Sequence, residues 1–171
     1  MSGLVVAGIG SRHLADDGVG LRLVESLDRP EAGVRRELWE DADALTLAHR
    51  LLELSGPVLL VDCADMDLAP GAWRCFRVWP AGKHGTGGQL LLRSPPLSTH
   101  GLGLAEAVQI ALALEPGLQV HVFGVQPFQV EPQPEGGEVL SPAMRSRLPA
   151  LRTALRQRIR SLNTTTCTEE A

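Results

Sequence analysis

The stretch Gly8-Ile9-Gly10-Ser11-Arg12-His13-Leu14-Ala15-Asp16-Asp17-Gly18-Val19-Gly20 decides how this chain folds. It begins inside the apolar run 4–9, which predicts a strand buried on both faces. The glycines that follow predict a turn, and apolar spacing predicts a helix over about 17–28. Two adjacent carboxylates therefore stand where a strand ends and a helix begins, a position suited to holding a cation or moving a proton.

The amino-acid composition indicates the class of protein and excludes some kinds of partner. A chain of 171 residues with 44% hydrophobic and 21% charged residues is typical of one globular domain, expected over 1–162 with a disordered tail over 163–171. A net charge of −4 gives no basic surface, so nucleic acid and membranes are not expected partners. The start shows no signal-peptide pattern, and the three cysteines show no CxxC spacing, so we expect a reducing, cytoplasmic location without a structural zinc site.

The remaining patterns alternate between strands and helices. Apolar or β-branched runs predict further strands over 34–40, 57–62, 72–79 and 118–125. Helical spacing predicts helices over 44–54 and 100–114, and a long C-terminal helix that begins at Ser141-Pro142. Pro149 is expected to kink or restart that last helix. The segment 80–99 is long for a compact domain and is either disordered or a lid that contacts substrate.

Connections between these elements predict the sheet. Helical crossovers make the first three strands parallel, whereas the short link 63–71 forces the fourth strand to run antiparallel. If the fifth strand is also parallel, the helix that leads into it begins at the same edge as the ends of the first and third strands. Ligands bind beyond the carboxyl ends of parallel strands. Asp17 follows the first strand at that edge, Asp62 ends the third strand there, and His100 opens the helix that leads into the fifth. We therefore expect Asp17, Asp62 and His100 to meet.

Two carboxylates and one imidazole can do two kinds of chemistry. They suit zinc, manganese, iron or nickel with coordination positions left open for a carbonyl or a water. They also suit metal-free acid–base catalysis, because paired carboxylates repel and can share a proton.

Each residue also has an ordinary structural role to weigh. Asp16 is expected to cap the first helix, Asp62 can cap the turn after its strand, and His100 can be a first-turn residue. Cys63 is expected to be a buried thiol or an additional soft ligand. No partners are predicted for the other histidines, and the arginines of the C-terminal helix are expected to face solvent; these residues are His49, His84, His121, Arg145, Arg147, Arg152, Arg156, Arg158 and Arg160.

A dinucleotide site is the main competing interpretation of the first loop. Gly8-x-Gly10 is present, but His13 occupies the position of the third glycine. Asp16 and Asp17 would also repel a pyrophosphate. The sequence therefore disfavours this type of site.

Four motifs in order resemble the nickel–iron hydrogenase maturation endopeptidases. They are Gly8-x-Gly10 with Asp16-Asp17-Gly18-x-Gly20, then Val61-Asp62-Cys63-Ala64-Asp65-Met66, Ser98-Thr99-His100, and Gly124-Val125-Gln126-Pro127. The resemblance covers about residues 3–160. It implies a three-layer α/β/α sandwich with a five-stranded mixed, mostly parallel sheet, of the phosphorylase/hydrolase-like kind.

The resemblance also implies a function. Family members are cytoplasmic, aspartyl-type endopeptidases that remove a C-terminal extension from the nickel-loaded precursor of the hydrogenase large subunit. Their metal-binding and catalytic residues correspond to Asp17, Asp62 and His100 here. They carry no metal cofactor of their own and recognise the nickel in the substrate. Asp16 would then orient the loop or act as a nearby base.

This chain departs from the family pattern at two places. Ser11 replaces a common Asn, and Asp41-Ala42-Asp43 replaces a Gly-Gly-Thr or Gly-Gly-Ser turn at the same edge. Two other functions stay open: a chaperone of the same fold that checks nickel without proteolysis, and an unrelated metal-dependent hydrolase.

Overall fold

The computed structural model describes residues 3–29, 31–82, 103–131 and 140–169. Its centre is a five-stranded sheet in the order β2-β1-β3-β5-β4. The strands are β1 (Leu4–Gly10), β2 (Val34–Glu40), β3 (Val58–Cys63), β4 (Trp73–Val78) and β5 (Val120–Val125). β1, β2, β3 and β5 are parallel, and β4 pairs antiparallel with β5. Both the predicted parallel strands and the predicted antiparallel one are confirmed.

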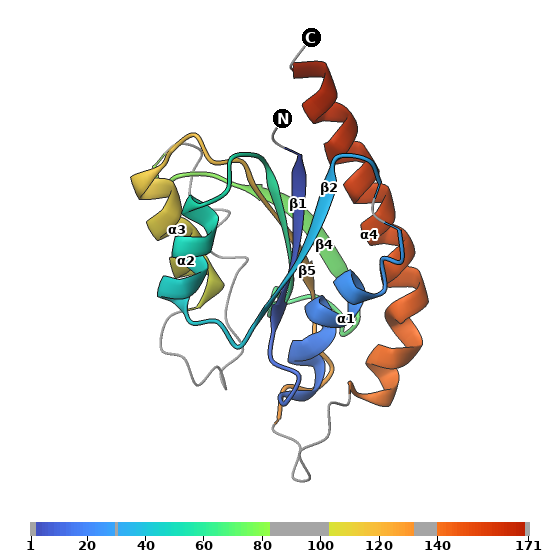
Figure 1. The fold of residues 1–171 in the computed structure, drawn as a ribbon. Coiled ribbons are helices and arrows are strands. Elements are labelled where there is room, and N and C mark those ends of the chain that lie inside the picture. The colour runs from blue at the N-terminus through green and yellow to red at the C-terminus, as the bar shows by residue number, and fades with distance from the viewer. Residues whose placement is uncertain (1–2, 30, 83–102, 132–139, 170–171) are drawn as a thin grey trace.

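Helices cover both faces of this sheet. α1 (Val19–Glu25) and α4 (Pro142–Glu169) lie on one face, and α2 (Ala44–Leu52) and α3 (Leu104–Leu114) lie on the other (Figure 1). Each face has its own apolar core, built around Leu23, Phe123 and Leu155 beneath α1 and α4, and around Leu51, Leu60 and Leu112 beneath α2 and α3. The expected three-layer α/β/α sandwich is therefore confirmed.

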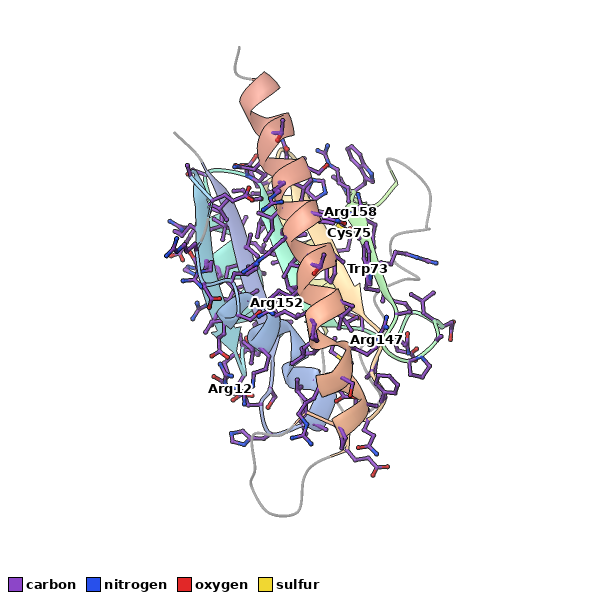
Figure 2. The ribbon with its side chains drawn as sticks, turned by 90° about the vertical axis from the view of Figure 1, so that its right-hand side faces the viewer. Arg12, Trp73, Cys75, Arg147, Arg152 and Arg158 are labelled. Atoms are coloured by element: carbon purple, nitrogen blue, oxygen red, sulfur yellow. The ribbon has the colours of Figure 1, made fainter. Side chains whose placement is uncertain are left out.

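The edge strand β4 is covered by α4 on one face. Trp73 stacks on Phe123 of β5 with ring centroids 4.9 Å apart. The guanidinium of Arg158 lies 5.8 Å above the Trp73 ring, and Figure 2 shows Trp73, Cys75 and Arg158 together beside α4. Arg158 was expected to face solvent, and although it is exposed, it also covers this aromatic side chain.

The first helix differs from the predicted one. A 3₁₀ turn, η1 (Ala15–Gly18), comes first, and α1 then runs only from Val19 to Glu25. Ala15 has φ 47°, a left-handed conformation that costs about 1 kcal/mol for a residue with a side chain. The two carboxylates thus belong to a tight, strained turn rather than to the first turn of an α-helix.

The C-terminal helix is more continuous than expected. α4 starts at Pro142, as predicted, and runs through Pro149 without restarting. It continues past Leu162, where we expected the ordered domain to end, as far as Glu169. The side-chain amide of Asn163 donates to the carbonyl of Ala32, and Arg160 pairs with Glu31 at 2.6 Å. Contacts to the loop before β2 therefore hold the helix at Arg160 and Asn163.

Some predictions fall outside the described residues. His84 and His100 are among them, as is most of the segment expected to be a lid, from residue 83 onward. Within the described residues, no helix has the length and apolar composition needed to cross a bilayer.

Candidate functional site

Close packing of glycines places the acidic turn at the carboxyl edge of the sheet. A Cβ on Gly8 would stand 2.8 Å from the carbonyl oxygen of Gly20, so β1 and α1 approach more closely than side chains would allow. Gly10 has φ 138°, and a Cβ there would stand 2.0 Å from the carbonyl oxygen of Asp17. Only glycine fits at position 10, and it folds η1 back over the end of β1.

Asp17 and Asp62 both lie at this edge of the sheet, in η1 and near the end of β3. Asp62 is the penultimate residue of β3, is 9% exposed, and accepts a hydrogen bond from the Cys63 N–H at 2.8 Å. Asp17 lies on η1 and its Oδ2 accepts a hydrogen bond from the Ser11 N–H at 2.8 Å. Burial raises the pKa of Asp62 well above its ordinary value of 3.8, and the negative charge of Asp17 raises it further. The two carboxylates are therefore close enough to repel.

Cys63 follows Asp62 directly in β3, but its side chain is closed off from solvent. Its side chain is 2% exposed, and burial raises the pKa of the thiol well above 9.0, with further contributions from Asp17 and Asp62. A thiol that keeps its proton is a poor nucleophile and a poor metal ligand. Cys63 is thus a buried structural residue, the first of its two predicted roles.

Asp16 does not cap its own helix, so that prediction is wrong. No side chain caps either η1 or α1. Instead the Asp16 side chain is fully buried and accepts hydrogen bonds from residues that follow β5 and precede α4. Because both of its oxygens are engaged away from solvent, the geometry also gives no support to a role as a base.

Gln126 is a second polar residue near this edge, and it stands in the motif Gly124-Val125-Gln126-Pro127 without a predicted role of its own. It is 9% exposed, and its Oε1 accepts hydrogen bonds from the Met66 N–H at 2.7 Å and the Leu68 N–H at 3.3 Å. Its Nε2 donates to Asp65 Oδ1 at 3.1 Å. Gln126 therefore fixes the chain that follows Asp62 against the end of β5.

The segment Asp41-Ala42-Asp43 forms a turn that connects β2 to α2. Asp41 has φ 49°, a conformation that glycine adopts freely and that aspartate tolerates better than most residues. Asp43 caps α2, because its Oδ1 accepts a hydrogen bond from the Thr46 N–H at 2.7 Å. Asp41 and Asp43 thus shape the connection from β2 to α2.

Arg12 ties the acidic loop to its surroundings on the side of β2. Its guanidinium pairs with Glu25 of α1 at 2.5 Å and with Glu40 at the end of β2 at 3.1 Å. Figure 2 shows Arg12 at the lower end of the molecule, well away from the Arg158 cluster beside β4. The Arg12 side chain is 10% exposed, but those of Glu25 and Glu40 are 36% and 37% exposed, so these ion pairs remain partly open to solvent.

The described part of the site thus offers two carboxylates. No group of three or more histidine, cysteine or acidic side chains with metal-binding geometry occurs among residues 3–29, 31–82, 103–131 and 140–169. His100, the third predicted ligand, lies outside these ranges. Of the predicted set, the structure describes Asp17 and Asp62, and it places both at the carboxyl edge of the sheet.

Of the remaining histidines, His49 faces solvent on α2 beside Glu53, as expected of a residue without a functional partner. His121 on β5 lies opposite Arg77 of β4, and burial and that cation lower the pKa of the imidazole to about 4. Neither residue contributes to the acidic edge.

Comparison with known proteins finds similarity in structure rather than in sequence. No protein-family model and no curated protein sequence matches the chain. The hydrogenase maturating endopeptidase HybD from E. coli is similar over 93% of both chains, with a TM-score of 0.66 and 20% identity. A [NiFe] hydrogenase maturation protease, HycI from Thermococcus kodakarensis KOD1, is similar over 93% of both chains, with a TM-score of 0.65 and 17% identity.

A third solved structure agrees. The hydrogenase 2 maturation peptidase from Thaumarchaeota archaeon SCGC_AB-539-E09 is similar over 92% of this chain and 97% of its own, with a TM-score of 0.59 and 22% identity. These matches extend over nearly the whole length of the chains compared. The chain therefore has the fold seen in these hydrogenase maturation proteases.

Proposed function

We propose that this protein is an endopeptidase that removes the C-terminal extension from the nickel-loaded precursor of a nickel–iron hydrogenase large subunit. One observation carries the proposal: Asp17 and Asp62 both lie at the carboxyl edge of the sheet, in a fold shared with hydrogenase maturation proteases. The proposed site residues are Asp17, Asp62 and His100. The proposed setting is the cytoplasm, with the precursor as partner and no metal cofactor belonging to the protein itself.

The electrostatics of the pair favour recognition of a cation carried by the substrate. Asp62 is buried, and the charge of Asp17 makes its ionised form still less favourable. A divalent ion beside both carboxylates offsets this repulsion and the cost of burial. The edge would therefore bind a precursor that contains nickel more tightly than one that lacks it, and this difference would act as the checkpoint.

Hydrolysis would follow from the same arrangement. The precursor's nickel, held by Asp17, Asp62 and His100, would polarise the scissile carbonyl or a water at an open coordination position. Oxygen from water adds to the carbonyl carbon, the C–N bond breaks, and the departing amine takes up a proton. The products are the mature large subunit and the free C-terminal peptide.

The test is an assay with purified precursor, prepared with and without nickel. Intact mass of the precursor would be measured after incubation with the wild type and with the Asp62→Asn and His100→Ala variants. We expect the extension to be lost only from nickel-loaded precursor, and both variants to slow cleavage at least about a hundredfold. His49→Gln, at an exposed position on α2, is the matched control and should cleave normally.

Other outcomes point to the two alternatives. Nickel-dependent binding of precursor with no loss of mass would support a chaperone that checks nickel without proteolysis. Cleavage of small ester or amide substrates by a protein that retains metal through purification would support a metal-dependent hydrolase. Either result would overturn the proposed endopeptidase.

A further inference from the structure

The Asp16 carboxylate is the most completely buried polar group near the acidic edge. The residue is 0% exposed, and its two oxygens accept four hydrogen bonds. Oδ2 accepts from the Phe128 N–H at 2.9 Å, the Gln129 N–H at 2.9 Å and the Ser141 hydroxyl at 3.0 Å. Oδ1 accepts from the Ser141 N–H at 2.8 Å.

These four hydrogen bonds join three separate segments. Phe128 and Gln129 follow β5, and Ser141 immediately precedes α4, where its hydroxyl accepts a hydrogen bond from the Met144 N–H at 3.2 Å. The backbone of Asp16 adds a fifth contact, because its N–H donates to the Gln129 carbonyl at 3.0 Å. Asp16 thus holds both ends of the connection between β5 and α4 against η1.

The same connection is fixed on its other side to the chain that follows Asp62. Gln126, two residues before Phe128, holds Met66 and Leu68 through its side-chain oxygen. A continuous chain of hydrogen bonds therefore runs from η1, through Asp16 and residues 126–129, to the segment after β3. This chain of contacts connects the two halves of the candidate site, one carrying Asp17 and the other Asp62.

The turn that carries Asp17 depends on such tertiary support. Ala15 is held in a left-handed conformation directly before Asp16, and no side chain caps η1. A turn of this kind keeps its shape only where surrounding contacts impose it. Asp17 is the next residue after Asp16, so its position follows from how Asp16 is held.

We propose that Asp16 is a positioning residue: its buried carboxylate anchors the turn so that Asp17 stays beside Asp62. Asp16 itself touches no substrate. The two adjacent aspartates therefore have different roles: Asp16 faces inward and fixes the turn, and Asp17 presents its carboxylate at the edge of the sheet. The effect on cleavage rests on the proposed function, whereas the effect on the position of Asp17 does not.

The Asp16→Asn variant tests the hydrogen bonds of the carboxylate separately from the volume of the side chain. Asparagine has the same shape but one acceptor oxygen, and its NH₂ group must face at least one of the N–H donors from Phe128, Gln129 or Ser141 whichever way the amide is turned. The substitution therefore disrupts the hydrogen bonds to the side chain of residue 16 without leaving a cavity. Leu27→Ala is the matched control, because Leu27 is 4% exposed and lies after α1, toward the opposite end of the sheet.

The first readout is the exchange rate of the Ser11 amide proton, which donates to Asp17 Oδ2 at 2.8 Å. Measured on folded protein, it should rise about tenfold in Asp16→Asn, as in Asp17→Ala, and stay unchanged in Leu27→Ala. Normal Ser11 protection in folded Asp16→Asn, or an equal rise in Leu27→Ala, would overturn the proposal.

The second readout is the split between kcat and KM on the nickel-loaded precursor. Displacement of Asp17 should lower kcat about a hundredfold in Asp16→Asn with little change in KM, while Leu27→Ala keeps both. Equal loss in the two variants would show a general effect of stability and would contradict a positioning role. If the wild type itself does not cleave the precursor, the proposed function fails, and the Ser11 exchange rate still decides the role of Asp16.

Discussion

Gly20 packs directly against the main chain of Val61, and a Cβ on Gly20 would stand 2.1 Å from the Val61 carbonyl oxygen. The neighbouring Ile9 carbonyl would be 2.7 Å away. Gly20, the second residue of α1, thus lies against both β1 and β3. Asp17 lies in the turn that follows β1, and Asp62 lies near the end of β3. This contact sets how closely the turn bearing Asp17 approaches the end of β3.

Replacing Gly20 with alanine should therefore destabilise the fold and separate the acidic pair. Because the obstructing atoms are backbone, we expect a loss of about 3 kcal/mol in the free energy of unfolding, measured in urea. Gly117→Ala is the control, since a Cβ there meets only the end of the Glu115 side chain at 3.3 Å. Equal stability of the two variants would contradict the close packing at Gly20.

Asp62→Asn should stabilise the protein at neutral pH while abolishing cleavage. In the folded state the pKa of Asp62 is raised above 3.8, so the native protein binds more protons than the unfolded chain above that pH. Stability contributed by this group is therefore lost as pH rises through the raised pKa. Asparagine keeps the acceptor for the Cys63 N–H and removes the charge.

We expect a gain on the order of 1 kcal/mol for Asp62→Asn at pH 7, shrinking as the pH falls toward 3.8. Urea unfolding at several pH values measures it. Asp28→Asn, at an exposed position, serves as the reference for loss of a surface charge. A variant that is less stable than wild type at pH 7 would show that the Asp62 charge is compensated in the free protein.

His121 should make the protein less stable in mild acid. Its pKa is lowered from 6.5 to about 4 by burial and by Arg77, so the unfolded chain binds more protons between these pH values. Stability is complete above pH 6.5 and is lost as pH falls toward 4, by about 1.5 kcal/mol after allowing for the partial exposure of the ring.

Thermal unfolding across this pH range is the measurement. His121→Gln should flatten the pH dependence, whereas His49→Gln, on the exposed side of α2, should leave it as in wild type. An unchanged pH profile in His121→Gln would assign the acid sensitivity to other groups.

Pro149→Ala should stabilise α4. Pro149 lies inside a continuous helix, is exposed, and has no N–H to donate to the carbonyl of Arg145. Restoring that hydrogen bond should raise the free energy of unfolding by about 1–3 kcal/mol. Ser146→Ala, at an exposed position of the same helix, should change stability by only a few tenths of a kcal/mol. A gain no larger than that of the control would mean that the helix already accommodates the proline.

The elements that could be predicted are those whose signal is local. Continuous apolar runs predicted β1 and β3, and the short connection after β3 was enough to make β4 antiparallel. The directions of β1 and β3 are then sufficient to predict that Asp17 and Asp62 lie at one edge of the sheet. The helix start at Ser141-Pro142 was equally local, because a hydroxyl followed by proline is a capping pattern.

The features that could not be predicted depend on contacts between distant residues. The sequence predicts that Asp16 caps a helix, because capping is the commonest role for an aspartate beside a helix. Its hydrogen-bond partners instead lie more than a hundred residues away in the sequence. Helix propensity predicts a break in the helix at Pro149 because it takes no account of tertiary packing. In the structure, Leu151 and Leu155 pack in the apolar core and hold α4 on the sheet. The strained conformation of Ala15 has no sequence signal at all.

The direction of the chain has a practical consequence for experiments on the proposed peptidase. β1 starts with Leu4 and α4 finishes with Glu169 at the same end of the molecule, and the connection from β1 to α1, whose turn η1 contains Asp17, lies at the other end (Figure 1). A purification tag or a surface linker attached at either terminus would therefore project away from the rim where a protein substrate must dock. Immobilised protein should capture a large precursor as readily as protein free in solution.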